Sequence, residues 1–596
     1  MKIKAGLEIH IQLDTEEKLF CKCKTTMTEE KPSKIVKRKL HPIVGELGLV
    51  DVAAQYEYLR EREYYYEYFE NESCLVELDE EPPRLINEDA LKLSLQVALL
   101  LNCKIPDKIQ VMRKTVIDGS NTSGFQRTAL IGFDGYLEIL NKKIEIKTVC
   151  LEEDACAIDK EENGKIYYKL NRLGIPLIEI STAIFEVENY KEIEEVAFNI
   201  GWLVKSIKKV KRGIGSIRQD VNISINSARM ELKGVQKLED IPKIVDYEVK
   251  RLIDLEKIVE EMRKRNVKIS EIIDLTNYFE KCDSELIKKF LCNGNKIFGL
   301  IFYNLGGLMN LKVSGRTFGK EISDYLKSFN SGIIHSEEDL EKYKLKKDFE
   351  FLAKEYKLGE KDVLAIFAAK NEAPIEFIKN KLERWINFGI ENETRKVNKD
   401  LSTSFLRPLP GSARMYPETD LPIISLSRDF IEKIKPNILP LNVLVNEISK
   451  KYNIDRNVIK EIARAELLDF FKEFLEKYKT LNPNFLSQVF LLLKKIGFDS
   501  EIFKNKKQEI EKIFEYIKDR KISKNAIEEI LEDLKYKKVD EIICEKNLFA
   551  FSKEELKNLL KDMGIKSEKD LKKIYSNQEL RKRIVTEILE EAMKEI

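Results

Sequence analysis

Long uncharged apolar runs are absent from this sequence: no stretch reaches the roughly eighteen residues that a membrane-spanning helix needs. A signal-peptide pattern is also absent, because Glu8 lies where the apolar core of such a segment would be. The nine cysteines are scattered, without the spacing of a disulfide framework, which is typical of a reducing compartment. These absences predict a cytoplasmic protein with no membrane association.

A net charge is nearly absent too, since 104 Lys and Arg residues balance 103 Asp and Glu residues. The overall charge therefore argues neither for nor against a nucleic-acid partner. With 43% hydrophobic and 35% charged residues, the composition is that of a folded globular protein. A chain of 596 residues is too long for one core, and its length suggests about four domains.

Two catalytic signatures are missing as well. The segment Gly315–Glu321 is similar to a Walker A loop, but three residues instead of four separate its glycines, and Glu follows its lysine. No cysteine or threonine has the surroundings of an activated nucleophile for amide hydrolysis. We therefore expect neither a P-loop nucleotide site nor an amidase.

The sequence does contain a series of carboxylates inside apolar, strand-like runs between residues 151 and 233. Burying an ionised carboxylate is costly unless a cation or a hydrogen-bond donor meets it. Several such runs close together predict one shared polar pocket, which could hold a metal. The runs are Leu151–Asp154, Pro176–Ile180, Arg218–Ser224 and Arg229–Lys233.

The segment Gly6–Leu13 alternates apolar and polar residues, which predicts a strand with two different faces. Glu8 and His10 share its polar face, about 6.5–7 Å apart, and could bind one ion. A second alternating segment places Arg218 and Asp220 on its polar face. Either strand could instead present an ordinary solvated face.

Two further polar stretches are candidates for binding phosphate. Residues 113–128 form a long, donor-rich segment between strands, which could bind a phosphate or a carboxylate, or could be a solvated hairpin. The basic, glycine-containing stretch 208–215 resembles a nucleotide phosphate site, although its Gly-x-Gly is too short for a fingerprint. The candidate donors of the first stretch are Arg113, Lys114, Ser123, Gln126 and Arg127.

Cys21 and Cys23 have the spacing of half a zinc site. A structural zinc needs four ligands, and no second closely spaced pair follows within the next hundred residues. Cys74 stands alone, and His41 precedes a proline. Free thiols are therefore expected here, and a structural zinc is not.

The pattern changes along the chain in a way that suggests domains. After a charged amphipathic helix at 239–268, residues 271–398 mix short strands and helices, and the pattern of the N-terminal region returns at 395–428. Surface loops tolerate inserted modules, so 271–398 is predicted to be an insertion. From residue 429 the chain is helical, with Lys-rich stretches that are either solvated helix faces or a surface that follows a nucleic-acid backbone.

Several motifs together resemble those of the B and E subunits of tRNA-dependent amidotransferases. The shared motifs are Gly6–His10, Leu19–Cys23, Leu151–Ala155, Pro176–Ile180 and the strand that contains Asp220. The archaeal E subunits are resembled more closely, and the similarity runs over nearly the whole chain. The features that favour them are Gly119–Arg127, Ile217–Asp220, Glu231–Gln236, Arg407–Glu418 and the insertion, which B subunits lack.

The resemblance implies an α+β multidomain fold. A cradle-like α/β catalytic domain, 1–270 completed by 399–428, would carry an aspartyl-tRNA-synthetase-like α+β insertion, 271–398. An all-α helical domain, 429–525, and a tRNA-binding helical tail, 526–596, would follow.

The implied activity is ATP-dependent conversion of Glu-tRNA(Gln) to Gln-tRNA(Gln). The γ-carboxylate would be phosphorylated and then amidated by ammonia from an asparaginase-like D subunit, in a heterotetramer of two D and two E subunits. Two alternatives are a noncatalytic tRNA-binding relative and a metal-dependent hydrolase that uses the same carboxylates. The acidic pocket argues against the first, and the surplus helical domains argue against the second.

The resemblance also implies site residues. Oxygen ligands favour Mg²⁺ or Mn²⁺, and the family implies Mg²⁺. Lys114 corresponds to a family lysine near the site, where it would hold an ATP phosphate or the reaction intermediate. The expected metal ligands are His10, Glu153 and Glu179, completed by Glu8 and Asp220; the expected nucleotide-binding residues are Lys114, Arg113, Gln126 and Arg218.

Overall fold

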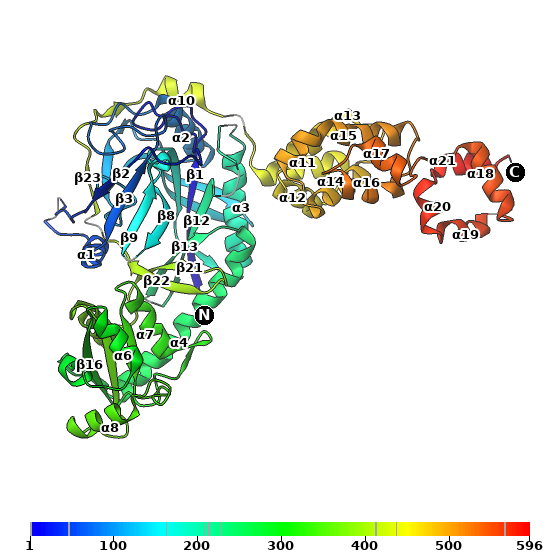
Figure 1. The fold of residues 1–596 in the computed structure, drawn as a ribbon. Coiled ribbons are helices and arrows are strands. Elements are labelled where there is room, and N and C mark those ends of the chain that lie inside the picture. The colour runs from blue at the N-terminus through cyan, green and yellow to red at the C-terminus, as the bar shows by residue number, and fades with distance from the viewer. Residues whose placement is uncertain are drawn as a thin grey trace. The chain divides into compact units, whose positions relative to one another are not determined.

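The computed structural model describes residues 3–595 except 46–47, 163, 208, 213–214, 227, 412–413, 437 and 566–567. Part of the predicted phosphate-binding stretch 208–215 therefore lies outside the described residues. The chain divides into two compact units, Met1–Ile438 and Leu439–Ile596. The first unit combines several sheets with helices and the second is helical, so the predicted α+β multidomain class is confirmed (Figure 1).

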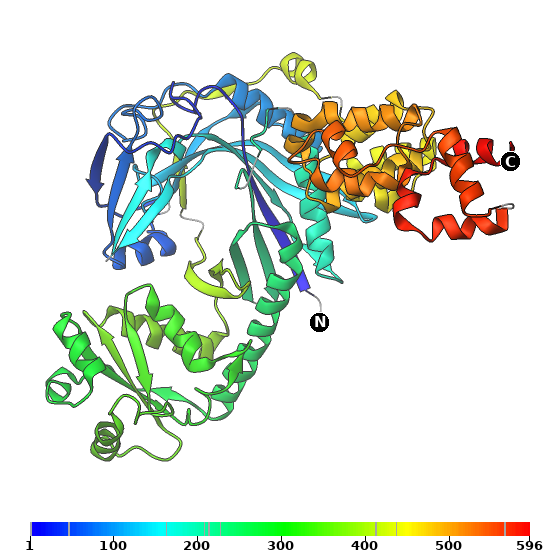
Figure 2. The same ribbon diagram turned by 45° about the vertical axis from the view of Figure 1, so that its right-hand side comes forward.

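An eleven-stranded sheet, counted over the described residues, forms the centre of the first unit (Figures 1 and 2). Its order is β22-β21-β13-β12-β1-β10-β7-β6-β5-β23, and β11 also pairs with β1. The strands are β1 (Ile3–Gln12), β5 (Val111–Thr115), β6 (Phe125–Ile139), β7 (Lys142–Glu153), β10 (Pro176–Thr182), β11 (Phe185–Val187), β12 (Ile217–Ile225), β13 (Ala228–Val235), β21 (Glu393–Val397), β22 (Thr403–Pro408) and β23 (Met415–Pro417).

One face of this sheet packs against three helices, α2 (Glu88–Leu100), α3 (Lys191–Lys205) and α4 (Ile241–Lys264). Leu7, Ile9 and Ile11 of β1 are at most 1% exposed and belong to the core that these helices complete. The predicted alternation in this strand is therefore confirmed, and the polar side chains are left on the opposite face. Asn87 caps α2 by accepting the Ala90 N–H at 3.0 Å, as Asn before a helix commonly does.

A four-stranded sheet with the order β2-β3-β9-β8 lies beside the central sheet. Its tyrosines form a small core, and their hydroxyl groups donate to the loop that joins β5 to β6. Tyr66 donates to Gly119 O at 2.7 Å, and Tyr64 donates to Ile117 O at 3.0 Å. The elements are β2 (Lys34–Arg38), β3 (Glu63–Tyr68), β8 (Ala157–Glu162) and β9 (Lys165–Lys169), with α1 (Val52–Leu59) before β3. A two-stranded sheet joins β4 (Lys108–Ile109) to β24 (Ile424–Ser425).

The expected insertion contains a separate five-stranded sheet with the order β14-β16-β20-β19, in which β15 also pairs with β16. Its strands are β14 (Lys268–Ile269), β15 (Ile273–Asp274), β16 (Lys296–Tyr303), β19 (Gly332–His335) and β20 (Val363–Ala369). Its other elements are α5 (Thr276–Phe279), α6 (Glu285–Cys292), the hairpin of β17 (Lys312–Val313) and β18 (Arg316–Thr317), α7 (Phe318–Lys327), α8 (Lys346–Glu355) and α9 (Ala373–Phe388).

Buried ion pairs join this inserted segment to the central sheet. Arg251 of α4 contacts Glu321 of α7 at 2.7 Å, and Arg395 of β21 contacts the same carboxylate at 3.2 Å. All three side chains are fully buried. Removing one partner would leave an uncompensated buried charge, so these ion pairs hold the inserted segment against the central sheet. Both accordingly belong to one compact unit.

Helix α10 (Arg428–Ile434) packs against α2 in the first unit, where Gln96 Nε2 donates to Ile434 O at 3.0 Å. The first unit therefore continues to Ile438, past the expected start of the helical domain at residue 429. The cause is the apolar face of α10, whose Ile434 is buried in the core of the first unit.

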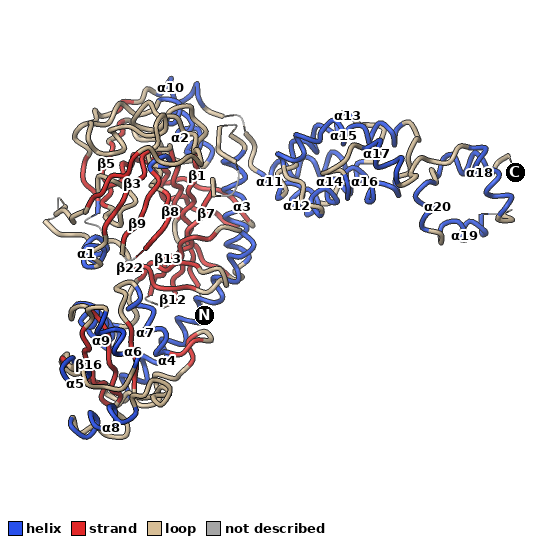
Figure 3. Tube along the Cα trace, viewed as in Figure 1, coloured by secondary structure: helices blue, strands red, loops and turns tan. Residues whose placement is uncertain are grey.

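The second unit is formed by helices and loops (Figure 3). A self-contained core near its C-terminus includes Leu556, Leu560, Ile574 and Leu589. Among the described residues, no helix combines the length and the apolar composition that crossing a membrane would require. The helices are α11 (Leu441–Tyr452), α12 (Arg456–Arg464), α13 (Leu468–Lys477), α14 (Pro483–Lys495), α15 (Ser500–Lys518), α16 (Ile527–Asp533), α17 (Val539–Glu545), α18 (Lys553–Asp562), α19 (Lys572–Tyr575), α20 (Gln578–Arg583) and α21 (Thr586–Met593).

Candidate functional site

Strand register brings distant polar residues together on the open face of the central sheet. His10 of β1 lies opposite Glu179 of β10, and Glu8 lies opposite Asp220 of β12. Directly opposed residues in antiparallel strands have Cβ atoms about 4.5–5.5 Å apart, so their side chains can interact. The predicted shared pocket therefore forms across three strands rather than within one segment.

The first group on this face, the His10 cluster, consists of His10, Lys114, Glu152 and Glu179. His10 Nε2 lies 3.3 Å from Glu179 Oε2, and Lys114 Nζ lies 3.3 Å from the same oxygen. Lys114 also contacts Glu152 Oε1 at 2.5 Å, and Thr128 donates to that oxygen at 2.7 Å. Lys114 thus contacts two carboxylates of this cluster.

The placement of Glu152 corrects the expected ligand set, which contained Glu153. Consecutive residues of a strand point to opposite faces of the sheet. Glu152 therefore joins the open face, where it lies within reach of His10 and Glu179. The carboxylate of Glu153 points the other way and contacts Arg127 Nη1 at 3.3 Å, and it also accepts the Arg127 N–H.

Two of the expected nucleotide-binding residues are engaged with neighbouring acidic groups. Arg113 pairs with Glu418 at 2.5 Å and with Asp420 at 3.2 Å, so the structure does not place it in the His10 cluster. Arg218 pairs with Asp154 at 2.8 Å. It nevertheless stays beside the site, because both residues line the same hollow as His10.

The second group, the Glu8 cluster, consists of Glu8, Asp220, Glu231 and Lys233. Lys233 Nζ lies 2.5 Å from Asp220 Oδ2 and 2.6 Å from Glu231 Oε1. Ligand atoms of the three acidic residues come within 4.8 Å of one another. Asn222 donates to Glu8 at 3.4 Å, which is a long hydrogen bond.

The pKa values of these groups reflect burial among charges of both signs. Burial alone would lower the pKa of His10, but its hydrogen bond to Glu179 and the charge of that carboxylate raise it. Burial opposes the ionisation of Glu179, yet Lys114 and His10 hold the pKa of this carboxyl well below its usual value. Burial, together with the charges of Glu179 and Glu231, raises the pKa of Glu8.

The two clusters contain more negative than positive charge, and a bound divalent cation would compensate the excess. The clusters contain five carboxylates but only two lysines, Lys114 and Lys233. Glu152 Oε2 is buried, and no protein group hydrogen-bonds to it. A group of His10, Glu152 and Glu179, and a group of Glu8, Asp220 and Glu231, each offer three ligand atoms close together. Oxygen-rich sets of this kind suit Mg²⁺ or Mn²⁺.

Two hollows open beside the clusters. One, of about 290 Å³, is lined by His10, Gln126, Arg218 and Asp220. The other, of about 480 Å³, adjoins Glu8. Each cluster therefore contributes a side chain to the lining of at least one hollow.

Sequence reasoning did not assign Glu152, Thr128 or Lys233 to the site. A signal for Glu152 was present, because alternation along β7 predicts that either Glu152 or Glu153 faces His10, but not both. Choosing between them requires the pairing of β7 with β10, where Glu152 lies opposite Leu177. Lys233 was found on the same strand face as Glu231, but its contact with Asp220 depends on the pairing of β12 with β13.

Comparison with known proteins places this chain in a defined class of enzyme subunit. The GatB/GatE catalytic domain family matches residues 3–432, and the chain belongs to this family of tRNA-dependent amidotransferase subunits. The resemblance inferred from the motifs is thereby confirmed. Subunits of this class belong to enzymes that form a carbon–nitrogen bond.

Three archaeal relatives of this chain are each named as the E subunit of glutamyl-tRNA(Gln) amidotransferase. The relative from Methanococcus maripaludis is 38% identical over 588 residues, which cover 94% of this chain and 91% of that protein. The relative from Methanocaldococcus jannaschii is 37% identical over 577 residues, with the same coverage. The relative from Aeropyrum pernix is 37% identical over 588 residues, which cover 95% and 91% of the two chains.

Proposed function

We propose that this chain converts Glu-tRNA(Gln) to Gln-tRNA(Gln) in two steps. An oxygen of the γ-carboxylate of tRNA-bound glutamate attacks the γ-phosphorus of ATP, and ADP leaves. Ammonia then attacks the acyl carbon, inorganic phosphate leaves, and the nitrogen loses a proton. The names of the relatives support the substrate, and the acidic face of the sheet supports the phosphoryl transfer.

The His10 and Glu8 clusters carry this proposal, because the first step brings two anions together. Lys114 and Lys233 offset part of that charge at the positions shown by their ion pairs. Mg²⁺ would be held by His10, Glu152 and Glu179, or by the three acids of the Glu8 cluster; when bound, it neutralises phosphate and carboxylate charge. Lys114 is placed to hold an anionic oxygen beside Glu179.

The substrates enter through the two hollows in this proposal. Gln126 and Arg218 line the smaller one and would contact the nucleotide, as predicted. Because Arg113 pairs with Glu418, we assign Arg113 to holding the segment that contains Glu418 and not to binding the nucleotide. An asparaginase-like D subunit would supply ammonia, in a cytoplasmic complex of two D and two E subunits.

The decisive experiment incubates the pure chain with Glu-tRNA(Gln), ATP, Mg²⁺ and ammonium chloride. We expect Gln-tRNA and ADP to form in equal amounts without a partner subunit. ATP-independent release of glutamate would instead indicate the metal-dependent hydrolase. Binding of tRNA with no turnover would indicate the noncatalytic relative.

The C-terminal helices are proposed to contact the body of the tRNA. Removing residues 552–596 takes away one self-contained core and should weaken tRNA binding by about tenfold, through lost phosphate contacts. Turnover of saturating tRNA should change less. An unchanged dissociation constant, measured at fixed salt concentration, would contradict a tRNA role for these helices.

A further inference from the structure

Strand β21 carries a polar residue toward the Glu8 cluster and charged residues toward the inserted segment. It pairs in parallel with β13, and Thr394 lies opposite Glu231 (Figure 1). Consecutive residues of a strand point to opposite faces, so Glu393 and Arg395 point away from Thr394. All three residues are 0% exposed, and buried polar groups need partners. Strand β21 therefore has polar contacts on both of its faces.

On the face of the Glu8 cluster, Thr394 holds one oxygen of Glu231. Thr394 Oγ1 donates to Glu231 Oε2 at 3.0 Å, while Lys233 Nζ lies 2.6 Å from Oε1. The two carboxylate oxygens thus have different partners, and these fix how the group is turned. A carboxylate oxygen has further acceptor capacity, so Glu231 can still bind a cation together with Glu8 and Asp220.

The side chain of Thr394 needs its hydroxyl group only for this contact with Glu231. Thr and Val are both β-branched and both suit a strand, so a valine would meet the demands of the backbone. Burying a hydroxyl costs free energy unless it forms a hydrogen bond. The bond to Glu231 is therefore the physical reason for a threonine at this buried position.

On its other face, β21 is held by two helices of the inserted segment. Tyr325 of α7 donates its hydroxyl to Glu393 Oε1 at 2.9 Å, and Lys381 of α9 contacts the same oxygen at 2.7 Å. Arg395 contacts Glu321 of α7 at 3.2 Å. Buried ion pairs are costly to break, so α7 and α9 fix the position of the strand that carries Thr394.

We propose that Thr394 is a positioning residue, which orients the Glu231 carboxylate to bind a divalent cation, and that α7 and α9 hold Thr394 in place through β21. The inference rests on the proposed function, because the cation is the one that phosphoryl transfer would need. Losing an outer hydrogen bond to a metal ligand typically costs about 10–100-fold in metal affinity or activity. The inserted segment would thereby act on the Glu8 cluster through a strand of the central sheet.

The test measures binding of Mn²⁺ to the full-length chain, without nucleotide or tRNA, from the electron paramagnetic resonance signal of free Mn²⁺. Thr394→Val should raise the dissociation constant of one site by about tenfold or more. Thr394→Ser, which keeps the hydroxyl, should bind nearly as tightly as the wild type. Glu231→Gln, which removes the charge of the ligand, should weaken the same site and so assigns it to the Glu8 cluster.

A matched control makes the same exchange at another buried threonine. Thr15 Oγ1 donates to Glu17 O at 2.7 Å, and Thr15 is 4% exposed. Thr15→Val should leave Mn²⁺ binding unchanged, even if both valine variants melt at a lower temperature. A hydroxyl that only stabilised the fold would change the melting temperature and not the affinity. If Thr394→Val does not fold, Thr394→Ala takes its place.

Tyr325→Phe tests whether the contacts of the inserted segment act through Thr394. It removes the hydroxyl that donates to Glu393 on the far face of β21. We expect a several-fold weaker Mn²⁺ site in this variant, and no further weakening when the exchange is added to Thr394→Val. Coupled residues give such non-additive effects, whereas independent residues give additive ones.

The possible failures are distinguishable. If the wild type binds Mn²⁺ and Thr394→Val binds it equally well, the positioning role is wrong and the proposed function is unaffected. Equal losses in Thr394→Ser and Thr394→Val would also overturn that role, because the hydroxyl would not be the cause. Additive effects of Tyr325→Phe and Thr394→Val would refute the route through β21. A wild type that binds no Mn²⁺ would remove the metal site itself and the proposed function with it.

Discussion

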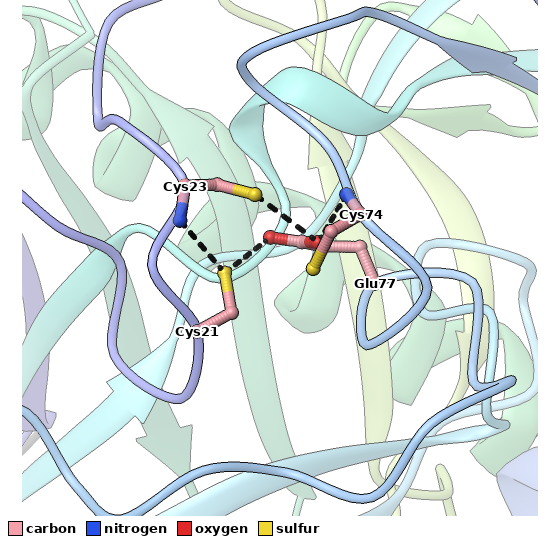
Figure 4. A group of neighbouring side chains, drawn as sticks. All are labelled: Cys21, Cys23, Cys74 and Glu77. Carbon is pink, nitrogen blue, oxygen red and sulfur yellow. Dashed lines mark hydrogen bonds between the residues drawn. The ribbon is translucent and has the colours of Figure 1, made fainter.

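The His10 cluster and a second group, the cysteine cluster of Cys21, Cys23, Cys74 and Glu77 (Figure 4), lie in the same compact unit but differ in ligand chemistry and in access. The His10 cluster offers imidazole nitrogen and carboxylate oxygen, has Lys114 among its acids, and adjoins a hollow of about 290 Å³. The cysteine cluster offers three sulfur atoms around a single carboxylate, with Cys21 and Glu77 buried. Hard oxygen ligands beside open space suit an exchangeable Mg²⁺, whereas buried sulfur ligands favour softer metal ions.

The comparison shows how one fold can separate reaction from support. Lys114 and His10 hold the pKa of the Glu179 carboxyl well below its usual value. Its negative charge would therefore be available to a cation in the proposed reaction. Glu77 is oriented by the Cys74 N–H and by Lys18. It lines neither of the two hollows that adjoin the His10 and Glu8 clusters. The predictions below test this separation.

The largest effect is expected from His10→Ala and Glu179→Ala. Each variant should lower the rate of ATP-dependent Gln-tRNA formation by more than about 100-fold. This exceeds the loss of about 10- to 100-fold that is typical when a residue only supports a metal ligand. The affinity for tRNA should not change, because the contacts with the body of the tRNA are proposed for the C-terminal helices. As a control, Lys143→Ala changes an exposed side chain of the same sheet that lines neither hollow, and this variant should remain active. Near-normal turnover in both alanine variants would remove the His10 cluster from the reaction.

A comparison of Glu152→Gln with Glu153→Gln tests the strand register. Glu152→Gln should raise the Mg²⁺ concentration for half-maximal rate by at least about tenfold, because it removes a charge next to Glu179. Glu153→Gln should leave that concentration nearly unchanged.

Glu153→Gln should instead lower the free energy of unfolding by about 1–3 kcal/mol, because it weakens a buried hydrogen-bonded partner of Arg127. The loss is limited, since Arg127 Nε keeps Glu418 at 2.8 Å. Denaturant unfolding and Mg²⁺ titrations measure the two effects. The reverse pattern would show that Glu153 faces the metal.

The smallest effect concerns pH. The pKa of His10 and that of Glu8 are both raised in the folded chain, and a metal ligand must be deprotonated. Apparent Mg²⁺ affinity should therefore fall several-fold as the pH is lowered from about 8 to about 6, through the range in which His10 gains its proton.

Kinetic titrations with Mg²⁺ at several pH values measure this effect. An apparent Mg²⁺ affinity that stays constant between about pH 8 and about pH 6 would contradict a role for His10 as a metal ligand.

Much of the central sheet could be predicted from local pattern. Alternation in β1 correctly separated Leu7 and Ile9 from Glu8 and His10, because a strand with one buried face must alternate. Asn87 correctly marked the start of α2. The boundary after residue 428 differed from that of the compact unit, since the attachment of α10 to α2 depends on packing between segments far apart in sequence.

The candidate site was predicted less completely, for a specific reason. His10, Glu179 and Lys114 were expected and lie in one cluster, whereas Asp220 lies in the Glu8 cluster on the same face of the sheet. Glu153 was chosen where the structure has Glu152, because a shift of one residue in a strand exchanges its two faces. Motif resemblance identified the right run of acids but could not decide which of two adjacent side chains faces β10.

The sequence by itself determined the absence of long apolar runs, the alternation of the strands and the motifs shared with the amidotransferase subunits. Tertiary structure alone decided which strands are neighbours, and so placed Glu179 beside His10 and Lys233 beside Asp220. It also brought Cys74 and Glu77 to Cys21. The reason is physical: local periodicity records which face of an element is buried, whereas partners distant in sequence are fixed only by the pairing and packing of the whole chain.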